Sequence, residues 1–483
     1  MKSSEIRLAL KKLISGEVLW DEEILKFYSV DASLYQVIPK VIVIPKTEKD
    51  VISIVKFAHK NKIAVTARGS GTGLVGSALN DGIVMDMKRF DAIRIQKNHV
   101  KIGVGVTKGS LDKSLKNKQK FFPPNPSIGP YCSLGGIIGN NSSGSRTLKY
   151  GSTIDNIKEI TFVDGHGRKI TLPKDQKIGE KIISLTKQIN LDRFPKVSKN
   201  SCGYRLDCIK SLKDTHKILA GSEGTLGIVL SANLTLKDIP PKRILFVVEY
   251  TSAKKAADNC QVIKDSGPSA LEFVDKSTLE NFNIKFTKNT KCLLFVEYDS
   301  NLKDNGKKFE RFVTGKILKK IENEKAIERW WKYRDLALSY SLKSIKKEDQ
   351  NPHIIEDAAV PLKNLGKLFS IIDKINNEFH TKTIMYGHAG DGNIHVRIIS
   401  SRQNSKILDE ISKKYFDQVI KLGGTITGEH GDGIARSEFV KMQYGCKNYQ
   451  IFKELKMIFD PKNILNPGKI TSHKRRFKRL EYF

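Results

Sequence analysis

The chain has 483 residues, of which 39% are hydrophobic and 28% are charged, and its formal net charge is +32. This length predicts two or three domains with an ample core, and no apolar run reaches the length of a membrane helix. Lysine is spread along the whole chain without an RRM, KH or zinc-finger signature, so scattered solvated lysines are favoured over nucleic-acid binding.

The six cysteines include no Cys-x-x-Cys pair, which argues against a thiolate zinc site or an iron–sulfur cluster. Residues 1–16 are rich in lysine but lack the continuous apolar stretch of a signal peptide. We therefore expect a cytoplasmic protein whose cysteines are reduced and structural.

A β-α-β unit is predicted near the N-terminus. Val41–Ile44 is typical of a short buried strand, and Thr47 caps a helix whose apolar residues recur at helical spacing. Ile63–Ala67 predicts a second strand, which leads into Arg68–Gly73 and then towards a third strand at Ile83–Met87. The glycines follow the second strand and no helix signal comes next, which argues against a Rossmann-type fold.

Three separate segments are rich in Gly and Ser: 68–73, 133–144 and 220–229. A glycine-rich loop beside an arginine suits a diphosphate, because bare backbone N–H groups can approach its oxygens. Glycine costs conformational entropy, so this density needs a reason. Ordinary turns explain any one of these segments, but all three together indicate one large, flat cofactor that packs on backbone.

A second set of strands is predicted after the proline break at Ile239–Pro241. Ile244–Tyr250 and Cys292–Tyr298 are both apolar and strand-like, and Arg329–Asp335 is predicted to be helical. The Pro-bounded turn at Asp460–Lys469 ends the folded part.

Two short segments carry three of the ten histidines. In Tyr386–Arg397 a Gly-Asp-Gly-Asn turn separates His388 from His395, and Gly428–Gly433 contains Glu429 and His430. Adjacent side chains of an extended segment face opposite ways, so we assign Glu429 to a His388-His395-Glu429 metal site and His430 to a separate role as general base. Three protein ligands leave a position open for substrate. The alternative is two Gly-Asp turns that carry histidines by chance.

These segments together resemble the FAD-linked oxidase family of the vanillyl-alcohol-oxidase type, in its D-lactate, glycolate and D-2-hydroxyglutarate dehydrogenase branch. The likeness covers residues 39–470. It implies an α+β fold with a two-subdomain FAD-binding domain (PCMH type) at 1–238. A substrate-binding cap domain with an antiparallel sheet, helices and the metal site would span 239–440, and residues 441–483 would return to the FAD domain and end in a basic tail.

The resemblance also assigns residues. Arg334 and Asn393 would bind the substrate. Thr72 stands where members with covalent flavin carry a histidine, which implies non-covalent FAD. The implied cofactor-binding residues are Arg68, Gly69, Ser70, Gly71, Thr72, Gly73, Pro124, Gly135, Gly136, Asn140, Ser143, Gly144, Glu223, Gly224, Gly227, Ile228 and Asn466.

The predicted reaction is oxidation of a D-2-hydroxy acid to the 2-oxo acid by a metal-assisted flavoprotein. Zinc is the first choice for the metal, with iron and manganese left open. Residues 354–360 are acidic and apolar, which favours D-lactate or glycolate over D-2-hydroxyglutarate. The electron acceptor is left open between an iron–sulfur partner, a cytochrome, an electron-transfer flavoprotein and quinone, as is homodimer formation.

Two rival functions remain at this stage. Two histidines and a carboxylate also describe a non-haem iron enzyme, although that leaves the three Gly/Ser segments without a purpose. The other rival is a basic binding protein for nucleic acid or a membrane surface. The tail Lys474–Arg479 suits either anionic lipid, which would give membrane association, or a solvated end.

Overall fold

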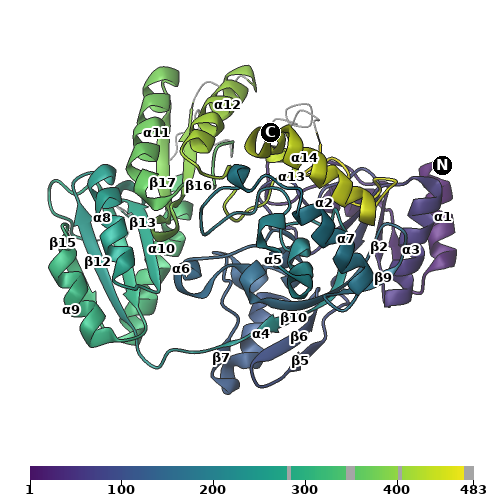
Figure 1. Cartoon of the computed structure of the whole chain (residues 1–483), viewed down its shortest axis with the longest axis horizontal. Helices are drawn as coiled ribbons and strands as arrows, with labels where there is room; N and C mark the ends of the chain where they lie inside the picture. Colours follow the sequence, from purple (N-terminus) through teal and green to yellow (C-terminus); the bar gives the residue numbers. More distant parts are fainter. Residues whose placement is uncertain (280–283, 344–353, 401–404, 473–483) are drawn as a thin grey trace.

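The computed structural model describes residues 1–279, 284–343, 354–400 and 405–472. Figure 1 shows two lobes, with the short helix α6 (Thr147–Tyr150) between them. The basic tail at 474–479 lies outside the described residues. Within the described ranges, no helix combines the length and apolarity needed to cross a bilayer.

The first sheet contains the predicted β-α-β unit. Thr47 caps α3 (Glu48–Asn61) by accepting the Asp50 N–H, and this helix packs with α1 (Ser3–Leu13) on one face of the sheet. The other face is covered by Tyr28 of α2 (Glu22–Tyr28). The last three strands are parallel, and the spatial order is β1 (Glu17–Leu19), β2 (Val41–Ile44), β4 (Ile83–Asp86) and β3 (Val65–Arg68).

A second, antiparallel sheet completes the same lobe. Its order is β5 (Ile93–Ile95), β6 (His99–Gly103), β10 (Ile228–Thr235), β8 (Ile157–Val163) and β9 (Lys169–Leu172). The short strands β7 (Lys120–Phe121) and β11 (Lys237–Asp238) pair with each other. The helices of this part are α4 (Lys108–Leu115), α5 (Leu134–Gly139) and α7 (Gln176–Thr186).

The other lobe is built on one antiparallel sheet. Its strands, in spatial order, are β15 (Lys316–Ile321), β12 (Ile244–Tyr250), β14 (Cys292–Tyr298), β13 (Ala270–Asp275), β17 (Lys382–His388), β18 (Asn393–Ile399) and β16 (Ala358–Ala359).

Helices cover both faces of this sheet because β12 and β14 are apolar at consecutive positions and successive side chains of a strand point to opposite faces. One face packs on α8 (Ala253–Asp265), α9 (Leu302–Phe312), α11 (Leu365–Phe379) and α12 (Ser405–Lys421). The opposite face packs on α10 (Glu324–Lys343) through Ile327 and Trp331. The expected α+β fold with an antiparallel cap is therefore confirmed.

The chain then returns to the first lobe. Residues after α13 (Gly433–Arg436) form α14 (Val440–Phe459), which is kinked at Gly445. Beyond it, the Val65 N–H donates to the carbonyl of Ile464, and the Asn466 N–H donates to the carbonyl of Val65, at 2.8 Å each. The return already begins at Ile434, whose N–H donates to Val75 in the first lobe at 2.7 Å. The domain limits at 238 and 440 stay predictions.

Candidate active site

The site begins on one face of β17 and β18. Successive side chains of a strand point to opposite faces, and the two strands pair with His388 opposite Asn393 and Tyr386 opposite His395. These four residues and Arg397 therefore share the α10 face of the sheet, whereas the intervening side chains enter the core on the other face, namely Ile394, Val396 and Ile398.

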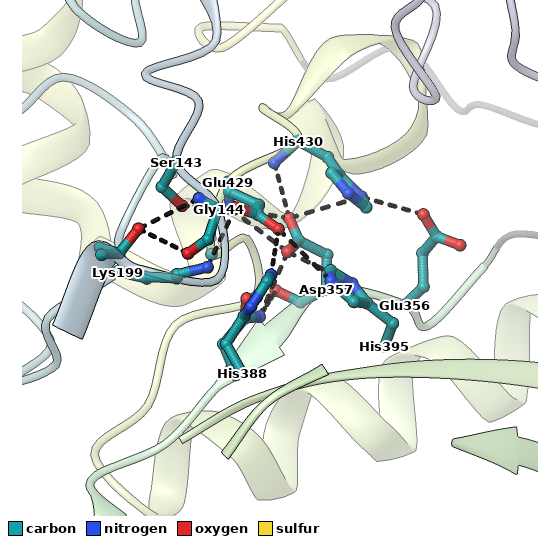
Figure 2. A network of polar contacts seen from close by, with 12 residues as sticks. Ser143, Gly144, Lys199, Glu356, Asp357, His388, His395, Glu429 and His430 are labelled. Atoms are coloured by element: carbon teal, nitrogen blue, oxygen red, sulfur yellow. Dashed lines mark hydrogen bonds and ion pairs between the residues drawn. The ribbon is translucent and has the colours of Figure 1, made fainter. Parts of the chain in front are cut away.

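Glu429 lies where the two predicted metal-binding histidines meet. Its Oε1 is 2.9 Å from Nε2 of His388 and 3.3 Å from Nε2 of His395. Its Oε2 accepts hydrogen bonds from Ser143 and, at 3.0 Å, from the fully buried Lys199. Figure 2 shows Lys199 and Ser143 on one side of this carboxylate and the histidines on the other. One oxygen of Glu429 is thus held by the protein, and the other faces both imidazoles.

Asp357 holds the loop that carries Glu429 and His430. Its carboxylate accepts the backbone N–H of Glu429 at 3.0 Å and that of His430 at 2.8 Å. Asp357 itself has a positive φ of 75°, which is rare for a residue other than glycine. Strain of this kind is characteristic of functional sites, where surrounding contacts keep it in place.

His430 closes the site from the other side. Its ring stacks on that of His395, with centroids 5.0 Å apart and planes 8° apart. Its Nδ1 is 2.9 Å from Oε1 of Glu356, and Oε2 of Glu356 is 2.8 Å from Nε of Arg397. Glu356 therefore bridges His430 and Arg397.

A buried carboxylate lies behind His388. Glu272 is fully buried, accepts from Nδ1 of His388 at 2.7 Å and is paired with Arg334. Burial would raise the pKa of Glu272, but Arg334 and His388 outweigh it and lower the pKa to about 2. Burial likewise opposes the charge on His388, yet Glu272 raises its pKa above the ordinary value.

The remaining imidazoles differ in charge preference. Burial, together with the neighbouring His430, lowers the pKa of His395 to about 4. Burial opposes a charge on His430 too, but Asp357 and Glu356 raise its pKa. The pKa of Glu429 is well below its usual range, because Lys199 and His388 outweigh the effect of burial. The site thus holds a neutral imidazole beside an ionised carboxylate, the state in which both bind metal ions.

Two overlapping sets of donors could hold a cation. Ligand atoms of Asp357, His395, Glu429 and His430 all lie within 4.8 Å of one another. The set predicted from the sequence is His388, His395 and Glu429, so it contains His388 in place of Asp357 and His430. We favour the latter because Asp357 already accepts backbone N–H groups and Nδ1 of His430 already faces Glu356, whereas Nε2 of His388 points at Glu429.

The expectation that Glu429 and His430 face opposite sides is wrong for this loop. Ligand atoms of both residues lie in one group. The reason is local: the segment is not an extended strand, and Gly431 has a positive φ of 86°.

The three Gly/Ser segments meet at one cavity, which ends at Glu429 and His430. At Gly69 an added Cβ would lie 1.9 Å from Oγ of Ser133, so only glycine permits this contact between the first two segments. At Gly224 an added Cβ would meet nothing within 4 Å, because the backbone faces open space there. Such a backbone-lined cradle fits a large flat cofactor. The predicted residues on its wall are Arg68, Gly69, Ser70, Gly71, Thr72, Gly73, Gly135, Gly136, Asn140, Glu223, Gly224 and Gly227.

Five predicted cofactor residues do not lie on this wall. Ser143 binds Glu429, Gly144 lines a neighbouring cavity, Ile228 belongs to the core of the first sheet and Pro124 is buried. Asn466 donates to the carbonyls of Ser77 and Glu223 at 2.8 and 2.6 Å and so joins segments behind the cavity.

The Arg68 side chain also has a structural task. It stacks on the Tyr28 ring and donates to the carbonyls of Tyr28 and Val30 at 3.3 and 2.8 Å. The backbone of residues 69–73, rather than this guanidinium, is therefore free to face a phosphate.

The two predicted substrate residues are buried behind the site. Asn393 is fully buried, and its amide donates to Asp357 and to the Ala358 carbonyl at 3.1–3.2 Å. Arg334 is paired with Glu272, stacks on Tyr386 and lines neither the glycine-lined cavity nor the neighbouring cavity at Gly144.

Several residues of the network were missed from the sequence: Lys199, Glu272, Glu356, Asp357, Tyr386 and Arg397. The polar–apolar alternation of residues 393–398 was a usable signal for Arg397, since it predicts that Arg397 shares a face with His395. Lys199 and Glu272 lie 230 and 116 positions from the residues they contact, and no local pattern marks them.

Comparison with known proteins agrees with this arrangement. Residues 39–172 match the FAD binding domain, and residues 239–470 match the C-terminal domain of FAD linked oxidases. The chain is 29% identical to the glycolate oxidase subunit GlcD of Bacillus subtilis, over 92% of this chain and 91% of that protein. It is also 29% identical to the D-lactate dehydrogenase of Archaeoglobus fulgidus, over 89% of this chain and 91% of that protein.

Another relative is much longer than this chain. The chain is 28% identical to the D-2-hydroxyglutarate dehydrogenase of Haemophilus influenzae, and the match covers 92% of the chain but only 49% of that protein. Among solved structures, an alkyldihydroxyacetonephosphate synthase superposes with a TM-score of 0.68 at 18% identity, over 96% of this chain and 84% of that one. This last likeness concerns the fold alone.

The two domain matches argue against both rival functions, the non-haem iron enzyme and the basic binding protein. The histidine cluster lies where the glycine-lined cavity meets the antiparallel cap. The chain belongs to the FAD-linked oxidase family and is a flavin-dependent oxidoreductase.

Proposed function

We propose that this enzyme oxidises a D-2-hydroxy acid to the corresponding 2-oxo acid. The observation that carries the proposal is the convergence of His388, His395 and Glu429 at the end of the FAD cavity, with His430 beside them. The relatives named glycolate oxidase subunit and D-lactate dehydrogenase match along most of their own length, which supports this substrate class.

The residues divide the work as follows. Bound FAD would accept the hydride from C2 of the substrate, and a divalent cation would act as a Lewis acid on the 2-hydroxyl. His388, His395 and Glu429 would hold that cation, and nitrogen ligands with one carboxylate favour zinc, with iron or manganese as alternatives.

His430 would remove the proton of the 2-hydroxyl. Because its Nδ1 faces Glu356, its Nε2 is the nitrogen available to accept the proton. A positioned base of this kind contributes about 10²–10⁴-fold to the rate. Arg334 would approach the substrate carboxylate only after loosening its pairing with Glu272.

D-Lactate and glycolate are the substrates that the sequence favoured. That preference rested on the acidic residues Glu356 and Asp357, but each now has partners: Glu356 pairs with Arg397 and His430, and Asp357 accepts backbone N–H groups. The acidic segment is therefore no argument against a second substrate carboxylate. D-2-Hydroxyglutarate becomes a second candidate for this reason.

Anaerobic flavin reduction tests the proposal. The purified protein is mixed with D-lactate, L-lactate, glycolate or D-2-hydroxyglutarate, and the flavin absorbance is followed with and without prior chelator treatment. We expect bleaching by a D-2-hydroxy acid or glycolate, loss of bleaching after chelation, and recovery with zinc or manganese.

His430→Asn is the matched variant, because it keeps a hydrogen-bonding side chain and loses the base. It should bind FAD normally and be reduced at least about 100-fold more slowly. Bound flavin that no 2-hydroxy acid bleaches would refute the reaction. Re-oxidation by an iron–sulfur protein, a cytochrome, an electron-transfer flavoprotein or quinone would then identify the acceptor class.

A further inference from the structure

The cavity end that carries His395 and His430 also carries a guanidinium for which the proposed reaction has no use. Arg397 lines the FAD cavity and is only 2% exposed. Its Nε faces Glu356, and its side chain hydrogen-bonds to the Tyr386 phenol. Among the residues that the structure describes, neither Nη1 nor Nε of Arg397 has a hydrogen-bond partner, although Nε forms an ion pair with Oε2 of Glu356 at 2.8 Å.

A buried, unsatisfied donor of this kind calls for an explanation, because leaving it unpaired costs free energy. If Arg397 served only to tie β18 to Glu356, its Nε contact would be sufficient, and the side chain would not need to border the FAD cavity. Glu356 divides its two oxygens between Arg397 and His430. It therefore fixes the guanidinium in place without covering Nη1.

The spacing along β18 indicates where a ligand of Arg397 would lie. Arg397 and His395 are two residues apart on the same face of the strand, which is a separation of about 6.6 Å. A substrate whose 2-hydroxyl lies beside His395 and His430 would reach Arg397 only with a group further along its carbon chain. A guanidinium is the side chain best suited to a planar carboxylate.

We propose that Arg397 is a specificity-determining residue that binds a second anionic group of the substrate, so that the preferred substrate is a 2-hydroxy diacid rather than a monoacid. This inference rests on the proposed function, because it places the reacting end of the substrate at His395 and His430. It favours a diacid where the sequence favoured lactate and glycolate.

One kinetic, one binding and one redox readout test it. Wild-type protein is compared with Arg397→Lys and Arg397→Met in anaerobic flavin reduction by D-lactate, D-malate and D-2-hydroxyglutarate. The 2-oxo acids pyruvate, oxaloacetate and 2-oxoglutarate are titrated in parallel, and binding is read from the flavin absorbance change without turnover. The flavin midpoint potential is measured for each variant.

Arg397→Met leaves Glu356 with one partner fewer, which lowers the stability of this variant. A second pair of variants is therefore compared: Glu356→Gln alone and Glu356→Gln/Arg397→Met. These two differ only in the guanidinium, and neither contains an uncompensated buried carboxylate at this position. The comparison therefore stays informative even where the single Met variant does not fold.

We expect the ratio of kcat/KM for the better diacid to kcat/KM for D-lactate to fall at least about tenfold without the guanidinium, and to recover in part with lysine. Affinity for the matching 2-oxo diacid should fall in the same proportion relative to pyruvate. Equal losses for mono- and diacids, or an unchanged ratio, would overturn the proposal.

A lowered midpoint potential with an unchanged diacid ratio would also overturn it, because Arg397 would then serve the flavin. If no hydroxy acid reduces the wild-type flavin but a 2-oxo diacid still binds in an Arg397-dependent way, the proposed reaction fails and the anion site stands.

Discussion

Removing the charge of Asp357 should release the loop that carries Glu429 and His430. The Asp357 carboxylate accepts two N–H groups of this loop, at 3.0 and 2.8 Å, and is fully buried. A hydrogen bond to a charged group contributes about 1.5–3 kcal/mol. Asparagine tolerates a positive φ, but Oδ2 accepts both N–H groups while Oδ1 accepts from the Asn393 amide. The NH2 group of Asp357→Asn must therefore face one of these donors, and about one such bond should be lost. Since 1.4 kcal/mol is about a factor of ten, local opening should become about 10- to 100-fold more frequent.

Hydrogen exchange of a peptide that spans residues 428–433 measures this opening directly. Two further variants separate hydrogen bonding from backbone strain. Asp357→Gly loses both bonds but accommodates the φ of 75° freely, whereas Asp357→Ala also pays about 1–2 kcal/mol for the left-handed conformation. We expect exchange to quicken from wild type to Asn to Gly to Ala. Exchange at the wild-type rate in both Asn and Gly variants would show that other contacts hold the loop.

Three other predictions concern the surroundings of the site. Glu272→Gln should weaken metal retention about 10- to 100-fold, because His388 loses the carboxylate that fixes its ring, and dialysis against graded chelator concentrations measures this. Burial and Asp432 raise the pKa of Glu223 to about 7. The folded state therefore holds this proton more tightly than the unfolded one, and the stability that it contributes is lost as pH rises from about 4.5 towards 7. Melting temperatures should fall over this range in the wild type and less in Glu223→Gln, and parallel curves would contradict the assignment. Gly71→Ala should cost about 1–2 kcal/mol at its φ of 70° and lower FAD affinity, as measured by flavin release on ultrafiltration. Unchanged flavin retention would mean that this turn does not shape the cavity.

The sequence was sufficient wherever a signal is local. The predicted cap strands at 244–250 and 292–298 coincide with β12 and β14, because in each a run of five apolar residues precedes a Glu-Tyr pair, and such a run between turn signals specifies a buried strand. The helix cap at Thr47 was likewise predictable from the residues that follow it. Glycine density was a sufficient signal for the cofactor cradle, since the three glycine-rich segments line one cavity and Gly69 makes a close contact with Ser133 that a Cβ would block.

Side-chain pairing across long separations was not predictable. The sequence around Arg334 would be the same whether its side chain bound the substrate or Glu272. Only the fold places Glu272 beside it. The same holds for Lys199 and Glu429. The acidic segment at 354–360 could not be interpreted from its composition for a related reason, because the effect of a carboxylate depends on its partners, and Arg397 and His430 come from other elements.

The return of the chain end to the first sheet has a consequence for biosynthesis. Val65 receives its partners from Ile464 and Asn466, and Lys469 donates to the Leu79 carbonyl at 2.6 Å. Most of the cofactor domain is synthesised first, yet it lacks these contacts until about 400 further residues have followed, as the Thr66–Asn466 separation shows. Contacts so distant in sequence form late. A nascent chain on the ribosome would therefore wait for residues 464–469 before it could retain FAD, and the interval is one in which chaperones have access to an incomplete flavin cavity.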